Sequence, residues 1–333
     1  MVYCAAVISM LIITACSRPG VDIYIAGFEE LSTGSRIPVL WVNGERTVLA
    51  GNTGSAWPFS IAVSGSDVHI AGVEIEYGLS QAVYWINGES TFLSDNENPT
   101  WASSIAVSGS DIYVAGREMD EQGRFRAVLW KNGVKTFLTD EPLSSIASNI
   151  FIYNNDMYIA GSDSNGEPQG PKAVYWKNGE RVLLSGITGD ARSNAIAVSG
   201  DDVYVAGHED FLAVYWVNGR MITLTDEMDI ANVSSIAVYD DDVYIAGNEV
   251  DHLGKTAAVY WRNGVIIILT DDAHTGAAHA VAIDDSTVYI AGRDSTPDNV
   301  RSAVYWVNGK MVVLPRGDDV VSSEAHAIAI VRR

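Results

Sequence analysis

The heptapeptide AVYWVNG occurs twice in identical form, at residues 213–219 and 303–309, and five near-copies of it recur along the 333-residue chain. Each copy carries one tryptophan, and successive tryptophans are spaced by 44, 45, 46, 40, 45 and 45 residues. Asn-Gly follows every tryptophan after one intervening residue. The tryptophans are Trp41, Trp85, Trp130, Trp176, Trp216, Trp261 and Trp306. A repeat of about 45 residues therefore organises nearly everything after residue 20.

Two further motifs keep the same rhythm. One is a DVYIAG-type segment, as at residues 242–247, and the other is a small apolar SIAV-type segment, as at residues 235–238. These runs are short, rich in β-branched and aromatic residues, and bounded by Gly, Asn, Asp or Ser, which is typical of β-strands. No window shows a sustained period near 3.6, so we expect almost no helix. With a TxLT-like segment, as at residues 222–225, each repeat supplies four strands.

The turns between these strands point to antiparallel pairing. Tight polar turns join the first and second strands, and Asn-Gly, a strong signal for a type I′ hairpin, joins the third and fourth. Four antiparallel strands at this period are typical of a propeller blade, so seven copies predict an all-β, seven-bladed β-propeller over residues 21–333. We expect the SIAV-type strand to lie innermost and the seven tryptophans to fill the wedges between blades.

The two ends of the chain predict how the ring closes. The first repeat begins with its second strand, at residues 21–27, while the chain ends with an extra first strand, at about 325–331. We therefore expect the C-terminal strand to complete the first blade, which would remove two exposed sheet edges.

The first 20 residues predict export. Residues 1–15 are an apolar run too short to span a membrane, as in a signal peptide. Residues 13–16, ITAC, resemble the bacterial lipobox, which implies a lipidated Cys16, a short tether over 16–20 and a location in the cell envelope, with the outer membrane or cell surface favoured. The run lacks the Lys or Arg that signal peptides carry. A buried N-terminal strand or helix is the alternative.

The net charge of the chain opposes binding to nucleic acids and to anionic membranes on electrostatic grounds and so favours other classes of partner. With 21 Lys and Arg against 42 Asp and Glu, the net charge is −21, which repels nucleic-acid backbones and anionic headgroups. We expect no nucleic-acid binding, contact with a membrane only through the lipid anchor, and a monomer.

One carboxylate recurs in the otherwise variable loops between the second and third strands, two residues after the strand glycine. Its members are Glu29, Glu74, Glu118, Asp163, Glu209, Glu249 and Asp294. We expect an acidic ring on the loop-rich face, with pairing to a base of the same loop, such as Arg36 or Arg301, as the main interpretation. Glu74 and Glu209 lack such a base and are the members expected to meet a cation or ligand. Ca²⁺ is the one ion considered.

A second candidate site is marked by residues that break the repeat near the innermost strand. These are Trp57, Phe59, Trp101, His279 and His326. They fall in blades seven, one, two and three, and aromatic rings beside carboxylates can stack on sugars or anchor a protein partner. Gap-filling rings and histidines bonded to backbone are the alternative. We predict no metal site at the histidine pair, because no third ligand at a set spacing is visible.

Catalysis is not predicted. The chain has no nucleophile elbow, phosphate-binding glycine loop, HExxH motif or Cys/His metal spacing, so we name no catalytic, cofactor-binding or metal residue. Two carboxylates at a suitable separation could still hydrolyse glycosides.

The repeat unit, with its VYIAG and AVYWxNG cores, resembles repeats of bacterial extracellular β-propellers and, more loosely, the HAF-type extracellular repeats with their W-x-N-G core. This resemblance covers residues 21–333 and concerns architecture more than activity. The function expected is therefore a binding module for an extracellular glycan or protein through the loop-rich face. A glycan-processing enzyme using the acidic residues and a structural envelope scaffold are the alternatives.

Overall fold

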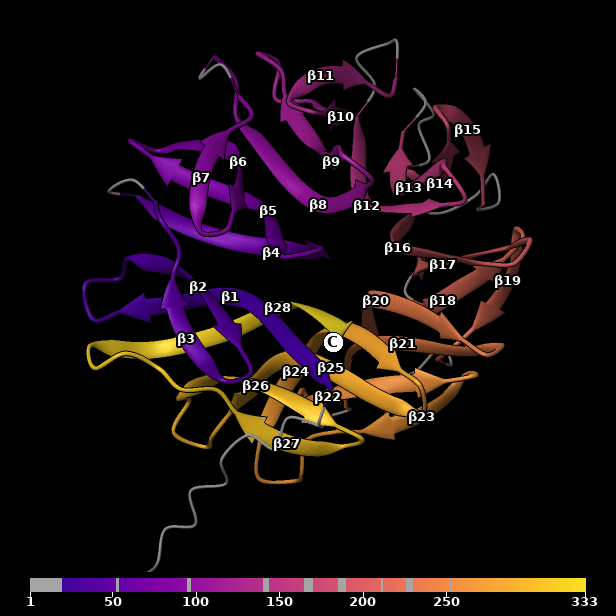
Figure 1. Ribbon diagram of the computed structural model, residues 1–333. Coiled ribbons are helices and arrows are strands. Elements are labelled where there is room, and N and C mark those ends of the chain that lie inside the picture. The colour runs from indigo at the N-terminus through magenta and orange to yellow at the C-terminus, as the bar shows by residue number, and fades with distance from the viewer. Residues whose placement is uncertain are drawn as a thin grey trace, which may run out of the picture.

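The computed structural model describes residues 20–51, 54–94, 97–139, 144–164, 170–184, 190–210, 212–225, 230–251 and 253–333. Within these ranges, strands β1 to β28 form seven four-stranded antiparallel sheets arranged around one axis (Figure 1). The predicted seven-bladed β-propeller is confirmed. In this part of the chain, no helix is long and apolar enough to span a membrane.

We number the blades in chain order and give the strands of each from the axis outward. Blade one contains β28 (Val320–Arg332), β1 (Val21–Leu31), β2 (Arg36–Val42) and β3 (Glu45–Val48). Blade two contains β4 (Ser55–Ser64), β5 (Asp67–Glu76), β6 (Leu79–Ile86) and β7 (Glu89–Phe92). Blade three contains β8 (Thr100–Ser108), β9 (Asp111–Met119), β10 (Phe125–Lys131) and β11 (Val134–Phe137). Blade four contains β12 (Ser145–Tyr153), β13 (Asp156–Asp163), β14 (Lys172–Lys177) and β15 (Glu180–Leu183).

The remaining blades repeat this order. Blade five contains β16 (Ala191–Ser199), β17 (Asp202–Glu209), β18 (Leu212–Val217) and β19 (Arg220–Thr223). Blade six contains β20 (Ile230–Tyr239), β21 (Asp242–Val250), β22 (Thr256–Arg262) and β23 (Val265–Ile268). Blade seven contains β24 (Thr275–Asp284), β25 (Thr287–Ser295), β26 (Arg301–Val307) and β27 (Lys310–Val313).

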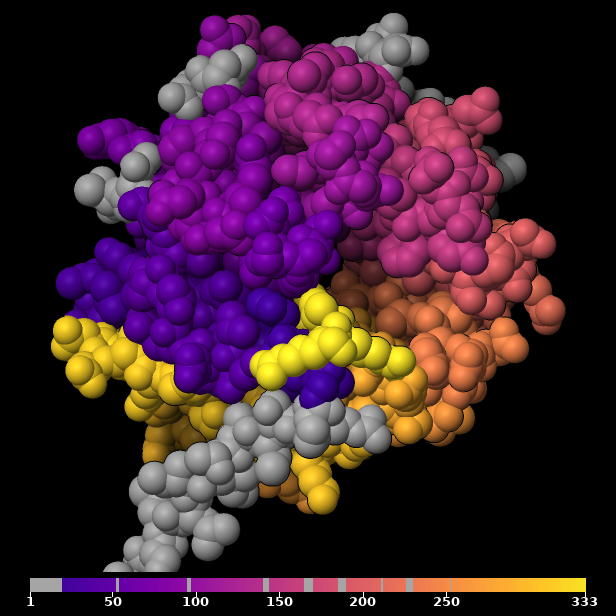
Figure 2. Space-filling model, in the orientation of Figure 1, coloured from indigo at the N-terminus to yellow at the C-terminus, as the bar shows by residue number. Residues whose placement is uncertain are grey.

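The ring closes in blade one, where the C-terminal strand β28 pairs with β1 as predicted. The strand is longer than the sequence suggests, running over Val320–Arg332. The backbone N–H of Arg333 donates to the carbonyl of Gly20 at 2.9 Å, so the two ends of the described chain meet. In Figure 2 the yellow C-terminal residues lie beside a hollow at the middle of the ring.

The seven repeat tryptophans lie between blades, as predicted, and each is at most 1 % exposed. Trp216 of blade five, for example, packs in one apolar cluster with Tyr158 and Ala173 of blade four. A buried Trp removes roughly 150–250 Å² from water. The AVYWVNG motif is therefore part of the frame.

The asparagine of each Asn-Gly turn does more than form the turn. It has a positive φ in every blade, as at Asn218 with φ 50°. Its side chain also accepts a hydrogen bond from the backbone N–H of Val203 at 2.9 Å and donates one to Asp202 at 2.6 Å. Equivalent bonds recur around the ring and tie the third and second strands together at their turn end.

The glycine of the VYIAG motif creates a bulge in the strand that lines the channel. A Cβ on Gly292 would lie 2.1 Å from the carbonyl oxygen of Ala277, so only glycine fits there. Opposite this glycine the innermost strand skips one residue in the pairing, as between Ala278 and Ala280. The skipped residues of the seven blades are Phe59, Ser103, Ser148, Asn194, Ser234, His279 and His326.

Candidate functional site

All seven skipped residues line one cavity of about 180 Å³ on the axis of the ring. We call them the channel ring. The innermost strands run from the face of the long loops, the loop-rich face, toward the face of the tight turns. A second cavity of about 370 Å³ lies next to this one, on the side away from the loop-rich face. Ser60, Asn149 and Ser235 line both cavities. Seven equivalent bulges thus aim seven side chains at one space.

The channel ring has two chemically different halves. Ser103, Ser148, Asn194 and Ser234 bring hydroxyl and amide groups from blades three to six. Phe59, His279 and His326 bring rings from blades two, seven and one. The structure thus brings together three of the residues that the sequence placed in one sector.

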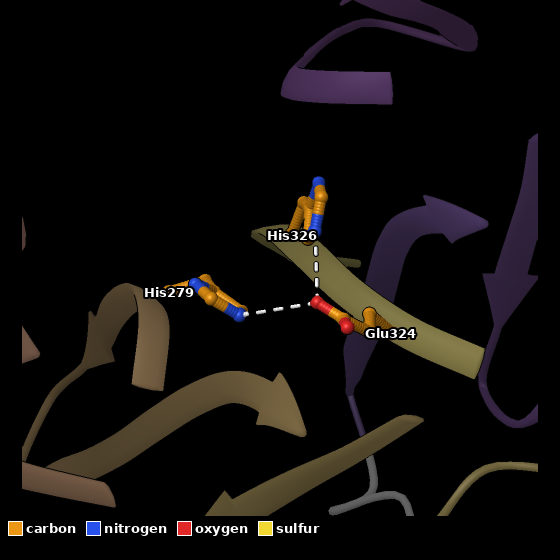
Figure 3. A group of neighbouring side chains, drawn as sticks. All are labelled: His279, Glu324 and His326. Carbon is orange, nitrogen blue, oxygen red and sulfur yellow. Dashed lines mark hydrogen bonds and ion pairs between the residues drawn. The ribbon is translucent and has the colours of Figure 1, made fainter. Parts of the chain in front are cut away.

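The two histidines converge on a buried glutamate (Figure 3). His279 comes from β24, whereas Glu324 and His326 are two residues apart on β28. The Nε2 atoms of His279 and His326 lie 3.7 and 3.5 Å from the same oxygen, Oε2 of Glu324. Glu324 was not proposed as a site residue from the sequence. It occupies the position that Trp57 holds in blade two, and that difference between repeats is the signal that could have found it.

Two arginines complete the surroundings of Glu324. Arg301 lies 3.2 Å from Oε1, and Nε of Arg293 lies 3.8 Å from Oε2. Burial alone would raise the pKa of Glu324, but the hydrogen bond and charge of His326, together with Arg293 and His279, lower that pKa to about 2. Burial, and then the charge of His326, lowers the pKa of His279 to about 3. Glu324 is thus ionised and His279 neutral at pH 7.

Aromatic rings extend from this cluster toward the loop-rich face. Phe59 stacks on His326 with ring centroids 6.0 Å apart, and Phe28 meets His326 edge-on at 5.3 Å. Trp57 lies edge-on to Phe28 at 6.4 Å, and the Arg36 guanidinium covers both of these rings. We call Phe28, Trp57, Phe59, His279 and His326 the aromatic sector. All but Phe28 are half-buried, so they keep surface that a ligand can reach.

Trp101 belongs to a separate group in blade three. Its ring meets Phe125 edge-on at 5.6 Å, and the Arg117 guanidinium lies 4.9 Å from the centre of each ring. Burial lowers the pKa of Arg117. The predicted sector therefore divides into two groups, and Trp101 packs with its own blade.

The acidic positions form less of an exposed ring than expected. Glu29, Glu74, Glu118, Asp163 and Asp294 are all buried, and Glu209 and Glu249 are half-buried. Glu29 does not pair with the base of its own loop: it accepts a hydrogen bond from Nε of Arg46 at 2.9 Å, while Arg36 pairs with Glu30. Strand pairing is the reason, because Arg46 lies opposite Trp41, on the sheet face that Glu29 shares.

The same arrangement recurs where a base stands five residues after the tryptophan. Lys135 lies 2.6 Å from Glu118, and Nη2 of Arg181 lies 2.8 Å from Asp163. In blade seven His274 takes this role, 3.1 Å from Asp294, whose pKa burial raises. These carboxylates therefore form ion pairs that stabilise the blades. Glu74 contacts other groups within the protein, and neither it nor Glu209 lines the channel ring.

A further polar cavity of about 370 Å³ lies at blades five and six and was not predicted. Its walls are Asp190, Arg192, Asn194, His208, Asp210 and Asn232. Its members largely bond one another, as Arg192 does with Asp190 and Asp190 with Asp210. Burial lowers the pKa of His208. Asn194 is shared with the channel ring, so this cavity adjoins the polar half of the axis.

The fold is similar to that of several solved structures. A puromycin-hydrolysing peptidase of Mycobacterium tuberculosis matches with a TM-score of 0.59 and 12 % identity, over 90 % of this chain and 52 % of that one. The β-propeller domain of the Trilobed protease from Pyrococcus furiosus matches with 0.54 and 11 %, over 91 % and 97 %. An acylaminoacyl peptidase of Pyrococcus horikoshii matches with 0.55 and 12 %, over 90 % and 51 %.

These similarities establish the β-propeller fold alone. The chain spans about half the length of the two whole peptidases. The Pyrococcus furiosus domain is described as having an open Velcro topology, whereas β28 closes the ring here. No protein-family model matches the sequence, and no curated protein does. The predicted signal peptide, Cys16 and the tether before residue 20 lie outside the described residues.

Proposed function

We propose that this chain is an exported binding propeller and that its ligand is an uncharged glycan held at the aromatic sector, beside the cavity that the channel ring lines. The observation that carries the proposal is that aromatic rings and hydroxyl, amide and imidazole groups line the same cavity. Aromatic rings pack against the apolar faces of sugars, and hydroxyl, amide and imidazole groups exchange hydrogen bonds with sugar hydroxyls. The net charge of −21 opposes the binding of acidic polysaccharides.

The frame supports binding because it fixes these side chains in advance. A bulge residue lies outside the strand ladder, so its side chain can meet a ligand without breaking strand pairing. The ring of blades behind it is rigidly packed, which lowers the entropy that binding costs.

Export and anchoring belong to the same proposal and rest on the lipobox-like residues before Cys16. A tether of four residues could reach about 14 Å, and Gly20 emerges on the tight-turn face beside Arg333. A lipid on Cys16 would therefore hold that face toward the membrane and leave the loop-rich face pointing outward. Cys16→Ser is expected to move the protein from the membrane to the soluble fraction. An unchanged distribution would contradict the anchor.

A glycan array and a protein array on the purified chain test the binding proposal. We expect retention on a neutral glycan, and Trp57→Ala combined with Phe59→Ala should weaken it at least tenfold, about 1.4 kcal/mol, because both stacking faces are lost. Leu253→Ala, an exposed loop change in blade six, should leave affinity unchanged. Trp101→Ala reports whether the second aromatic group takes part.

The remaining outcomes separate the alternatives. Retention that survives the Trp57 and Phe59 changes would place the site elsewhere. Cleavage of a bound glycan would make the protein an enzyme, and a hit on the protein array alone would make the partner a protein. No retention on either array would favour a scaffold of the cell envelope.

A further inference from the structure

Three metal-ligating side chains meet at the wall of the channel. Within the described part of the chain, one group of three or more His, Cys, Asp or Glu side chains has the geometry to hold a metal ion, and it is His279, Glu324 and His326. Their ligand atoms lie within 4.8 Å of one another. Ligands about 2.0 Å from a tetrahedral metal stand about 3.3 Å apart. The 3.7 and 3.5 Å separations from Oε2 of Glu324 are close to that spacing.

The hydrogen bond on the far side of His326 fixes how this imidazole is protonated. Nδ1 lies 3.1 Å from the carbonyl oxygen of Pro58 in blade two. A carbonyl only accepts hydrogen bonds, so Nδ1 carries the proton and donates it. In the neutral ring the lone pair of Nε2 then points toward Glu324. A backbone carbonyl on the second nitrogen is the usual support of a metal-bound imidazole.

His279 contributes a second nitrogen with unmet bonding capacity. Its Nε2 is buried and has no hydrogen-bond partner among the described residues. It lies 3.7 Å from the carboxylate oxygen that also faces His326. With its proton on Nδ1, His279 presents the lone pair of Nε2 to this point. The three lone pairs that then meet there are stable only with a positive charge between them. That charge is either a proton on an imidazole or a metal ion.

Two neighbouring arginines contact Glu324 and leave its Oε2 atom facing the histidines. Arg301 holds Oε1 of Glu324 at 3.2 Å and leaves Oε2 to face the histidines. Nε of Arg293 lies 3.8 Å from Oε2, so its positive charge opposes a cation there. Phe59 and Phe28 pack on His326 and restrict its rotation.

We propose that His279, Glu324 and His326 bind one divalent ion of the Zn²⁺ class, with its fourth position open to the channel cavity. Two imidazoles and one carboxylate suit zinc and related transition metals rather than Ca²⁺ or Mg²⁺, which prefer oxygen ligands. The third ligand that the sequence lacked at a set spacing is Glu324. The open position would accept an oxygen or nitrogen atom of a ligand in the channel. The site does not depend on glycan binding.

Cobalt and zinc titrations of the untagged, chelator-treated protein test this site. We expect one Co²⁺ per chain with the strong visible absorption of a tetrahedral complex, displaced by Zn²⁺, and a melting temperature that rises with Zn²⁺. His279→Gln and Glu324→Gln should each weaken binding at least tenfold. His208→Gln, a change at a half-buried histidine of blade five, should not. Arg293→Gln should strengthen binding, because it removes the opposing charge.

Two controls separate loss of metal binding from loss of folding. Melting curves in chelator show whether each variant folds, and Arg293→Gln tests the site without removing a ligand. Wild-type protein that binds no Co²⁺ would overturn the proposal and leave an imidazolium–carboxylate pair at this point. Binding that His279→Gln and Glu324→Gln leave unchanged would place the ion elsewhere and overturn it equally.

Discussion

At the scale of single residues, the feature that shapes the channel is a glycine of the second strand opposite a residue that the first strand leaves unpaired. The glycine of each VYIAG motif leaves room for the backbone of the innermost strand, and the residue opposite it escapes strand pairing. A bulge residue takes no part in strand pairing, so its side chain can vary without disturbing the sheet. This explains why the repeat carries serine, asparagine, phenylalanine or histidine at that position, while the position two residues later is Ile or Val in every repeat.

Asp22 is a residue whose contribution can be followed by pH. Hydrogen bonds from Arg333 and Asn43 lower its pKa from 3.8 to about 2. Because the folded pKa lies below the unfolded one, the stabilisation is complete above about pH 4 and is lost as the pH falls toward 2.

Asp22→Asn should therefore lower the free energy of unfolding near neutral pH, and the gap to wild type should narrow between pH 3.8 and about 2. Chemical denaturation at a series of pH values measures it. Arg333→Gln should reproduce part of this loss, since it removes one of the two donors. A gap that stays constant across this range would show that folding does not lower the pKa of Asp22.

Residue-level predictions failed where strand register decided the contact. Bases near the acids in sequence were expected as partners, but long side chains on the same sheet face meet instead, as Glu29 and Arg46 do. A base five residues after the tryptophan was visible in three repeats and could have given the pairs. Glu324 was missed for another reason: the repeats align it with Trp57, but its contact with His279 of the neighbouring blade depends on a distance that the alignment does not give.

At the scale of the element, the third strand of each blade carries adhesion between blades. Trp216 of β18 contacts the preceding blade through Tyr158 and Ala173. Its periodic recurrence made this role predictable, because packing between identical units repeats with the units.

Trp216→Ala should lower the free energy of unfolding by about 3–5 kcal/mol, the range typical of large aromatic truncations in a core. Thermal or denaturant unfolding measures the loss. Trp57→Ala should cost much less, because Trp57 is only half-buried and meets blade one through Phe28 and Arg36 alone among ring contacts. Equal losses in the two variants, or none at Trp216, would contradict the packing described here.

At the scale of the whole molecule, the ring and its closure could be predicted because both follow from counting. Six complete repeats, with three strands of a blade at the start of the chain and one strand at its end, leave one arrangement without open edges. The pairing of β28 with β1 confirms it, and Arg332 reinforces it by bonding Asp284 and Asp285 of blade seven.

The candidate site could be predicted only in outline, because it exists only once the ring is assembled. Blade seven supplies His279, the C-terminal strand supplies Glu324 and His326, and blade two supplies the carbonyl of Pro58. Sequence differences between repeats singled out Trp57, Phe59, His279 and His326, together with Trp101, which packs with its own blade. Burial, protonation and the convergence of lone pairs depend on distances that no repeat alignment contains.

The contact between Gly20 and Arg333 also means that the order of blades along the gene is one choice among several. A short linker could join these neighbours, and new termini could be opened in a loop between other blades without changing any strand's partners. A circularly permuted gene of this kind would encode the same ring. It would also move the chain's start from the tight-turn face to the loop-rich one, which would reverse the way an N-terminal tether presents the channel.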